Sequence, residues 1–311
     1  IIKLKNIKPV LTENNIVKTK PIQSQPPLKS SSLVKKVELT PKPTIKQKKI
    51  NKIAPIMKAP SNLMVGKTWT ENKTNMEFMG VPGGCFQMGS VDGISNEKPV
   101  HEVCVDDFFM GKFEVTQKQW NLVMGNNPAD FQSWVQKTDD YPVESVSWED
   151  VQSYVSKLNQ MTGHVFRLPS EAEWEFACRG KSHQDIFSGG NSSVTVDEIA
   201  NICDKKCQYE WRSKQHDDGY EKISPVGLKK PNSYGLYDMS GNVWEWIEDG
   251  YDELAYEKHL NKNPLITGGK KKVGRGGSWV VHYQLSRCAA RRDGEKNKKA
   301  NDLGFRLIKL N

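Results

Sequence analysis

The glycine-rich run at residues 274–279, which reads Gly-Arg-Gly-Gly-Ser-Trp, is the strongest constraint on what this chain can fold into. Glycine lacks a Cβ atom and adopts positive φ at little cost, so the backbone can turn sharply and approach another segment closely. The tryptophan that ends the run supplies a large apolar area for burial. The pattern predicts backbone packed closely under an aromatic ring.

The chain divides near residue 60 into two parts of different composition. Residues 1–60 contain no aromatic residue, no arginine and no glycine, but they carry 8 of the 16 prolines, 14 lysines and only two acids. Such a segment cannot bury enough apolar surface to offset its ordering entropy, so we expect an extended Lys/Pro-rich tail. Its net charge is +12 and the whole chain carries +8, which leaves residues 61–311 at −4.

All nine tryptophans, all six cysteines and all 24 glycines follow residue 60. The remaining length is enough for one well-buried core, and the high glycine content with few long apolar runs indicates a loop-rich single domain. We place this domain at residues 76–311 and treat residues 61–75 as a connector. No run approaches the 18 apolar residues that a membrane helix needs. Ile1 is not an initiator methionine, and we expect a leader or lipid anchor upstream of it.

Local patterns predict both strands and helices in the domain. Residues 78–89 and 101–116 alternate apolar and polar side chains around glycine and proline, which is typical of strands joined by tight turns. Apolar residues recur at helical spacing over residues 151–161, and Gly163 ends that helix.

A second helix is expected after Ser170, because a glutamate three positions later gives the spacing of a capping box. Glu171, Glu173 and Glu175 alternate along this short helix. We expect them at the surface, where they cap the helix and form salt bridges rather than act as an acid/base pair. Near the end of the chain, Arg306 is expected to pair with a buried carboxylate or with backbone carbonyls.

Three motifs occur in a fixed order: Arg-Leu-Pro-Ser-Glu-Ala-Glu-Trp-Glu at 167–175, Asn-Val-Trp-Glu-Trp at 242–246, and the glycine-rich run at 274–279. Together they resemble the formylglycine-generating-enzyme (sulfatase-modifying-factor) family, and the resemblance extends from about Met76 to Leu310. It implies an α+β domain with a C-type-lectin-like FGE-sulfatase fold and little regular secondary structure.

The resemblance also gives a reason to doubt the family's oxidase activity. In the catalytic branch, two cysteines follow the Gly-Gly-Ser-aromatic motif and bind copper. Here the shorter segment between Trp279 and Cys288 reads Val-Val-His-Tyr-Gln-Leu-Ser-Arg and offers no soft sulfur ligand. We therefore expect neither copper nor formylglycine formation. The only candidate catalytic groups in this segment are His282, Tyr283 and Arg287, and a single histidine is more often structural than catalytic.

The six cysteines are interpreted as three disulfides. Two pairs follow from local pattern, one flanking the first hairpin and one in a short polar loop, and the third is implied by the family resemblance. The alternatives are six free thiols or a zinc site at the close pair. Disulfides indicate an oxidising compartment, so we expect a periplasmic or cell-surface protein. The expected pairs are Cys85–Cys104, Cys203–Cys207 and, by resemblance, Cys178–Cys288.

Two structural calcium sites are implied by the resemblance. Calcium prefers carboxylate and backbone carbonyl oxygens in a flexible shell, and the Asp/Gly-rich segments of this domain offer both. The alternative is an ordinary Asp/Gly turn with a glutamate that caps backbone amides. Carried over by motif, the first set is Asn201, Ile202, Asp218 and Tyr220, and the second is Asp238, Gly241, Val243 and Glu245.

Three functions remain open on the sequence. The first is a non-catalytic binding or scaffolding protein of an exported assembly, which docks to protein subunits through residues 1–60. The second is a divergent oxidative or metal-dependent enzyme. The third is a ligand-binding variable protein of the retroelement type, with variation across residues 280–302. Nucleic acid is not an expected partner, because the tail has lysines but no aromatic residue or arginine to contact bases.

Overall fold

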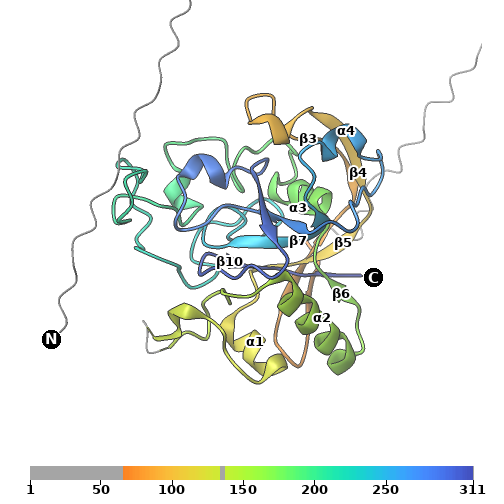
Figure 1. The fold of residues 1–311 in the computed structure, drawn as a ribbon, viewed down its shortest axis with the longest axis vertical. Coiled ribbons are helices and arrows are strands. Elements are labelled where there is room, and N and C mark those ends of the chain that lie inside the picture. The colour runs from red at the N-terminus through yellow and green to blue at the C-terminus, as the bar shows by residue number, and fades with distance from the viewer. Residues whose placement is uncertain (1–65, 134–136, 311) are drawn as a thin grey trace, which may run out of the picture. The chain divides into compact units, whose positions relative to one another are not determined.

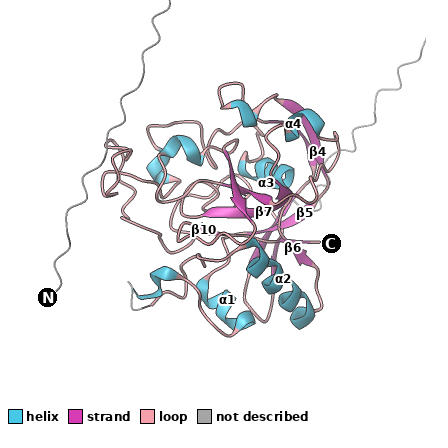
Figure 2. Cartoon of the chain, viewed as in Figure 1, coloured by secondary structure: helices cyan, strands magenta, loops and turns pink. Residues whose placement is uncertain are grey.

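The computed structural model of the protein describes residues 66–133 and 137–310. The tail at residues 1–60, and with it the predicted docking role, lies outside the described residues. Among the described residues, no helix has the length and apolar character needed to span a bilayer. Figure 1 shows short strands and helices joined by long loops, and Figure 2 shows that these loops make up much of the domain.

An antiparallel sheet of five short strands brings the two ends of the domain together. The final strand lies between two strands that precede it by more than a hundred positions in sequence, so the C-terminal segment completes the sheet. Trp69 on the first strand packs 5.5 Å from Phe78, so the sheet starts within the segment assigned to a connector. In spatial order the strands are β1 (Thr68–Thr70), β2 (Glu77–Val81), β5 (Phe108–Gly111), β11 (Ile308–Lys309) and β6 (Phe166–Arg167).

A second sheet carries two of the three sequence motifs. Its strands are β10 (Leu303–Gly304), β7 (Trp244–Gly250), β8 (Lys271–Arg275) and β9 (Arg291–Glu295), of which β10 and β7 run parallel. The predicted hairpin forms separately from β3 (Gly84–Met88) and β4 (His101–Val105).

The helix expected after Ser170 begins where the sequence predicts. Each of the three longer helices starts at a Thr or Ser whose hydroxyl accepts from the N3 amide, while the N3 side chain accepts from the N-cap amide, which satisfies two otherwise free amides. Glycines in the left-handed region end the first two helices. The helices are α1 (Gln117–Met124), α2 (Trp148–Thr162), α3 (Glu171–Cys178) and the single-turn α4 (Ala255–Lys258).

The core has two main parts. One surrounds α3 and is formed with β3, β4, β7 and β8, and the other packs α1 and α2 against the five-stranded sheet. The glycine-rich run packs closely under an aromatic ring, as predicted, but the ring is a different one. Gly276 and Gly277 have φ of +98° and +75°, and a Cβ at Gly276 would lie 3.3 Å from the ring of Trp174. The ring over the backbone therefore comes from α3 and not from the tryptophan that ends the run.

The structure joins the three predicted cysteine pairs, and it leaves no free cysteine among the described residues. Cys85 and Cys104 lie opposite each other in the β3–β4 hairpin. The Cys178–Cys288 bridge connects the end of α3 to the segment before β9 across 110 positions of sequence.

One expectation is wrong. The three glutamates of α3 do not lie at the surface: the exposed fractions of Glu171, Glu173 and Glu175 are 0, 9 and 0%. The physical reason is that the whole helix is enclosed by the core, and arginines from distant strands neutralise the buried carboxylates. The salt-bridging role holds, but in the interior.

Candidate functional site

The loop that follows Trp279 is anchored at its start by hydrogen bonds from the segment around residues 203–211. The side chains of Val280 and Val281 are half-buried. Both of their carbonyls are occupied, because Trp211 Nε1 donates to Val280 O at 2.7 Å and Cys203 N donates to Val281 O at 3.0 Å. This part of the loop is therefore closed by local hydrogen bonds and presents no thiol.

Each of the three weak catalytic candidates packs against or pairs with other side chains of the domain. His282 lies 4.3 Å from Tyr283 between ring centroids, and burial with the neighbouring His216 lowers the pKa of His282. Tyr283 packs edge-on against His216 at 5.2 Å. Arg287 makes two hydrogen bonds of 2.8 Å to Glu97, which is 1% exposed. The arginine therefore pairs with a buried carboxylate.

An aromatic surface, made by Tyr209 and Trp211, stands over this loop. The two rings are stacked with centroids 4.6 Å apart and planes 9° apart, and their exposed fractions are 41 and 55%. The bond from Trp211 to Val280 and the nearby Cys203–Cys207 bridge hold the segment in place. Exposed aromatic rings held rigidly at low entropic cost are typical of binding surfaces.

The first predicted calcium set is rich in oxygen atoms and largely buried. Asn201 is 1% exposed and its Oδ1 has no hydrogen-bond partner. The carboxylate of Asp218 accepts from the amides of Ile202 at 2.7 Å and Tyr220 at 2.9 Å. Burial raises the pKa of Asp218 to about 6. An unpartnered amide oxygen beside a buried carboxylate fits the donor chemistry of a calcium ligand set.

Lys229, which the sequence patterns did not single out, lies beside this set. Its Nζ donates to the backbone carbonyls of Asp218 at 2.5 Å and Asp197 at 2.7 Å. Burial lowers the pKa of Lys229, while Asp218, Asp197 and Asp204 oppose that shift. The chain thus supplies one positive charge of its own beside the first set.

The second predicted set surrounds a concentration of buried acids. Asp238 and Glu245 are 3 and 0% exposed, and Glu114, 1% exposed, lies with them although it was absent from the predicted set. Burial raises the pKa of Asp238 to about 6 and that of Glu114 well above its usual range. Arg306 donates hydrogen bonds of 2.7 Å to Glu245. Among the described residues, it is the only buried guanidinium that contacts this group of acids.

The alternative interpretation of the second set also finds support. The Glu245 carboxylate accepts from both Arg306 and Trp174 Nε1, the latter at 2.7 Å, so its oxygens already have donors. Asp238 accepts from the amide of Gly227 at 2.7 Å. The predicted pairing of Arg306 with a buried carboxylate is confirmed. That this set holds calcium stays a prediction.

The two sets are adjacent in space. Asn201 forms an isolated parallel bridge with Gly241, and Asn242 N donates to Asn201 O at 2.8 Å. A Cβ at Gly241 would lie 2.1 Å from that carbonyl oxygen, so only glycine fits there. The fold therefore brings together two segments that the sequence could link only by family resemblance.

A buried ion-pair network surrounds α3. Glu171 bonds Arg291 at 2.6 and 2.8 Å, and Glu175 bonds Arg179 and Arg275. These arginines hold the pKa of Glu175 at about 2 against its burial. Periodicity gave no signal for this network, because the basic partners of α3 on β8 and β9 lie about a hundred positions away in sequence.

Comparison with known proteins places this geometry in a family. The family model described as "Sulfatase-modifying factor enzyme 1-like domain" matches residues 66–310. The chain is 30% identical to the formylglycine-generating enzyme of Mus musculus over 282 residues, covering 73% of each chain. It is 30% identical to chaperone protein LppX of Paenibacillus barcinonensis, covering 74% of this chain and 88% of that one. It is 28% identical to the inactive C-alpha-formylglycine-generating enzyme 2 of Bos taurus, covering 79% of this chain and 92% of that one.

Solved structures agree with the assignment. Variable protein 1 of Treponema denticola matches with a TM-score of 0.68 and 27% identity over 78% of this chain and 98% of that chain. PvdO from Pseudomonas aeruginosa matches with a TM-score of 0.67 and 25% identity over 82% of this chain and 100% of that chain. The three motifs, the C-type-lectin-like α+β fold and the family match lead to one conclusion: this chain belongs to the sulfatase-modifying-factor (formylglycine-generating-enzyme) family.

Proposed function

We propose that this protein is a non-catalytic binding or scaffolding member of its family. The observation that carries the proposal is the loop after Trp279. It holds valines and a histidine where the catalytic branch has copper-binding cysteines, and hydrogen bonds from Trp211 and Cys203 occupy its first carbonyls. Arg287 and Tyr283 are engaged in packing and ion pairing. Fold alone does not carry activity, and one of the relatives is itself named inactive.

The aromatic surface is the proposed contact region on the domain. Tyr209 and Trp211 expose two stacked rings above the loop, and a disulfide two positions before Tyr209 limits the motion of the segment. The Lys/Pro-rich tail at residues 1–60 is the second proposed contact region, with a charge of +12 that suits an acidic partner. The partners are expected to be protein subunits of an exported assembly.

An exported location is part of the proposal. Three disulfides and no free cysteine among the described residues are typical of proteins that fold in an oxidising compartment. Structural calcium at the two oxygen-rich sets fits the same setting. There Asn201 Oδ1 and Asp218 would serve the first ion, and Asp238 with the carbonyls of its motif would serve the second. A bound ion would neutralise buried acids and pin the two segments together.

The activity test uses a cysteine-containing sulfatase peptide incubated with the pure protein, copper(II) and oxygen. Mass spectrometry then looks for the conversion of cysteine to formylglycine. We expect no conversion under conditions in which the enzyme of Mus musculus converts the same peptide. Formylglycine in the product would overturn the proposal.

The binding test compares the full chain, the chain without residues 1–60, and the double variant Tyr209→Ala/Trp211→Ala in pull-downs from an envelope extract of the source cells. We expect a defined partner to be lost or weakened at least tenfold in one of the altered chains. The same partner bound equally by all three proteins would show that neither contact region is used.

A second candidate is a ligand-binding variable protein, supported by the similarity to variable protein 1 of Treponema denticola. Sequencing this gene from closely related isolates tests it. Substitutions concentrated in residues 280–302 would favour this function, and a uniform sequence there would exclude it.

A further inference from the structure

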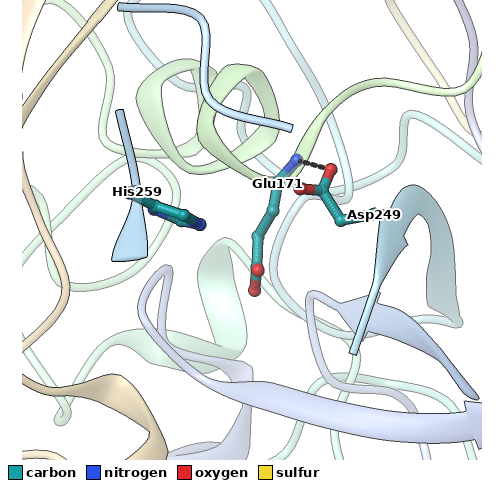
Figure 3. Close-up of side chains that lie close together, drawn as sticks. All are labelled: Glu171, Asp249 and His259. Atoms are coloured by element: carbon teal, nitrogen blue, oxygen red, sulfur yellow. Dashed lines mark hydrogen bonds between the residues drawn. The ribbon is translucent and has the colours of Figure 1, made fainter. Parts of the chain in front are cut away.

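Three potential ligand groups, two carboxylates and one imidazole, come from separate segments and meet at the ion-pair network of α3. They are Glu171 at the start of α3, Asp249 in β7 and His259 just after α4, drawn together in Figure 3. Each offers one ligand atom, and the three atoms lie within 4.8 Å of one another. Glu171 and Asp249 are 0 and 1% exposed. No sequence motif connects them.

A chain of hydrogen bonds determines which nitrogen of His259 carries its proton. His101 Nδ1 lies 3.0 Å from the carbonyl oxygen of Pro99, and His101 Nε2 lies 3.0 Å from His259 Nδ1. A carbonyl oxygen only accepts, so the proton of neutral His101 is on Nδ1 and its Nε2 accepts. His259 Nδ1 must then donate, and the lone pair of His259 is on Nε2.

This lone pair has no partner in the described part of the chain. His259 Nε2 is buried and accepts no hydrogen bond, although it faces two carboxylates. A bare imidazole nitrogen beside two carboxylates is a complete three-ligand set for a borderline divalent metal with an open position.

We propose that Glu171, Asp249 and His259 hold a divalent metal ion of the zinc class. The supporting contacts are those that metal ligands require. Asp249 is oriented by the amides of Glu171 at 2.8 Å and Ile266 at 2.9 Å, and His259 is oriented by His101. The ion would connect α3, β7 and α4, and so attach the segment around α4 to the core.

The arginines that contact Glu171 determine which metal ions this site favours. Arg291 and Arg275 both contact the Glu171 carboxylate, and a carboxylate with about four lone-pair directions can still accept a further ligand. The positive charges weaken purely electrostatic binding, which disfavours calcium and magnesium at this place. They affect the bond to the imidazole less, so the site selects a metal with nitrogen affinity.

The test is zinc uptake by the full chain. Protein stripped with a chelator and then saturated with calcium, so that the calcium proposal plays no part, is titrated with ZnCl₂ by calorimetry, and bound zinc is measured after gel filtration. We expect one zinc ion per chain for the natural protein and none for His259→Ala. His164→Ala, which removes an exposed histidine elsewhere, is the matched control and keeps the full equivalent.

A second variant guards against misfolding. His101→Phe leaves the three ligands in place but removes the acceptor for His259 Nδ1, and loss of such a supporting contact weakens metal binding by roughly 10–100-fold. No zinc uptake by the natural protein, or equal uptake by the natural protein and the folded His259→Ala variant, would overturn the proposal. A buried water would then be the group that bridges the two carboxylates and the imidazole.

Discussion

At the scale of single residues, buried carboxylates outnumber buried cations around the 238–245 motif. Glu114, Asp238 and Glu245 share the guanidinium of Arg306. Burial raises the pKa of Glu114 and of Asp238, and repulsion from the neighbouring carboxylates adds to both shifts. A divalent cation is the largest local charge that such a site can receive, and it reverses the direction of these shifts. The acids therefore make calcium binding and pH interdependent.

Calcium is expected to raise the unfolding temperature at pH 7.5 and to have little effect at pH 5. The pKa of Asp238 is about 6 without metal, so the carboxylate is protonated below that pH and cannot serve as a ligand. At calcium concentrations a hundred times Kd the gain is about 2.7 kcal/mol. Differential scanning calorimetry measures the shift. Asp238→Asn should remove most of it, while Asp293→Asn, an exposed control, should keep it.

Glu144 should make the folded state less stable as pH rises. It is 0% exposed, its Oε2 has no partner, and burial raises its pKa from 4.5 to about 7. A carboxyl group with a raised folded pKa binds more protons in the folded state, so its contribution is present below pH 4.5 and lost as pH rises through 7. Each pKa unit corresponds to about 1.4 kcal/mol.

Urea unfolding at pH 5 and pH 8, with a chelator present, measures this effect. Glu144→Gln should reduce the loss of unfolding free energy between the two pH values by about 1–3 kcal/mol. An unchanged pH dependence in the variant would show that Glu144 is not the group that titrates.

At the scale of elements, α3 shows which structural features local sequence can predict. The capping box and the position of the helix follow from Ser170 and Glu173 alone. The burial of Glu171 and Glu175 does not, because their partners Arg291 and Arg275 come from strands that only the complete fold brings near. Local sequence patterns therefore predict the position of the helix but not the burial of its side chains.

The same limit applies to the candidate sites. The calcium sets contain recognisable Asp/Gly and Asn-x-Trp-Glu motifs, so the sequence identifies their residues through family resemblance. Glu114 is hidden in a strand-like stretch, and Asp249 and His259 lie where the sequence looks like a polar surface loop. Nothing in their neighbours signals a shared site, because the site exists only after β7 and α4 pack beside α3.

Removing one charge from the α3 network should cost more than removing an exposed one. Arg275 is 0% exposed and pairs with Glu175 and the carbonyl of Ala290. Arg275→Met leaves a buried carboxylate without one of its two cations, which typically costs 3–5 kcal/mol. Lys258→Met removes an exposed partner of Asp252 and should cost about 0–1 kcal/mol. Chemical denaturation of the natural protein and both variants measures their free energies of unfolding. The comparison requires that all three show the same dependence of this free energy on denaturant concentration.

At the scale of the whole molecule, disulfides substitute for regular secondary structure. The described domain is rich in loops (Figure 2), and the three bridges close loops of very different length. The bridge from Cys178 to Cys288 spans the two calcium sets and β7 and β8, so it restricts the unfolded chain across most of the C-terminal half.

The long bridge should therefore contribute more to stability than the short one. In the chain-entropy model, closing 110 positions stabilises by roughly 4.8 kcal/mol and closing four by roughly 1.9 kcal/mol. Cys178→Ala/Cys288→Ala should accordingly lower the free energy of unfolding by about 3 kcal/mol more than Cys203→Ala/Cys207→Ala. Denaturant titrations of the two double variants test this order. A reversed order would show that the loop around Cys203 depends on its bridge for native packing.

The position of β11 has a consequence for biosynthesis. Ile308 and Lys309 pair with β5 on one side and β6 on the other, so the sheet has a gap until these residues leave the ribosome. A nascent chain that is secreted as it is translated would thus reach the export machinery before its native sheet can close. A premature stop only a few codons upstream would leave two open strand edges, and such products should be cleared by proteolysis.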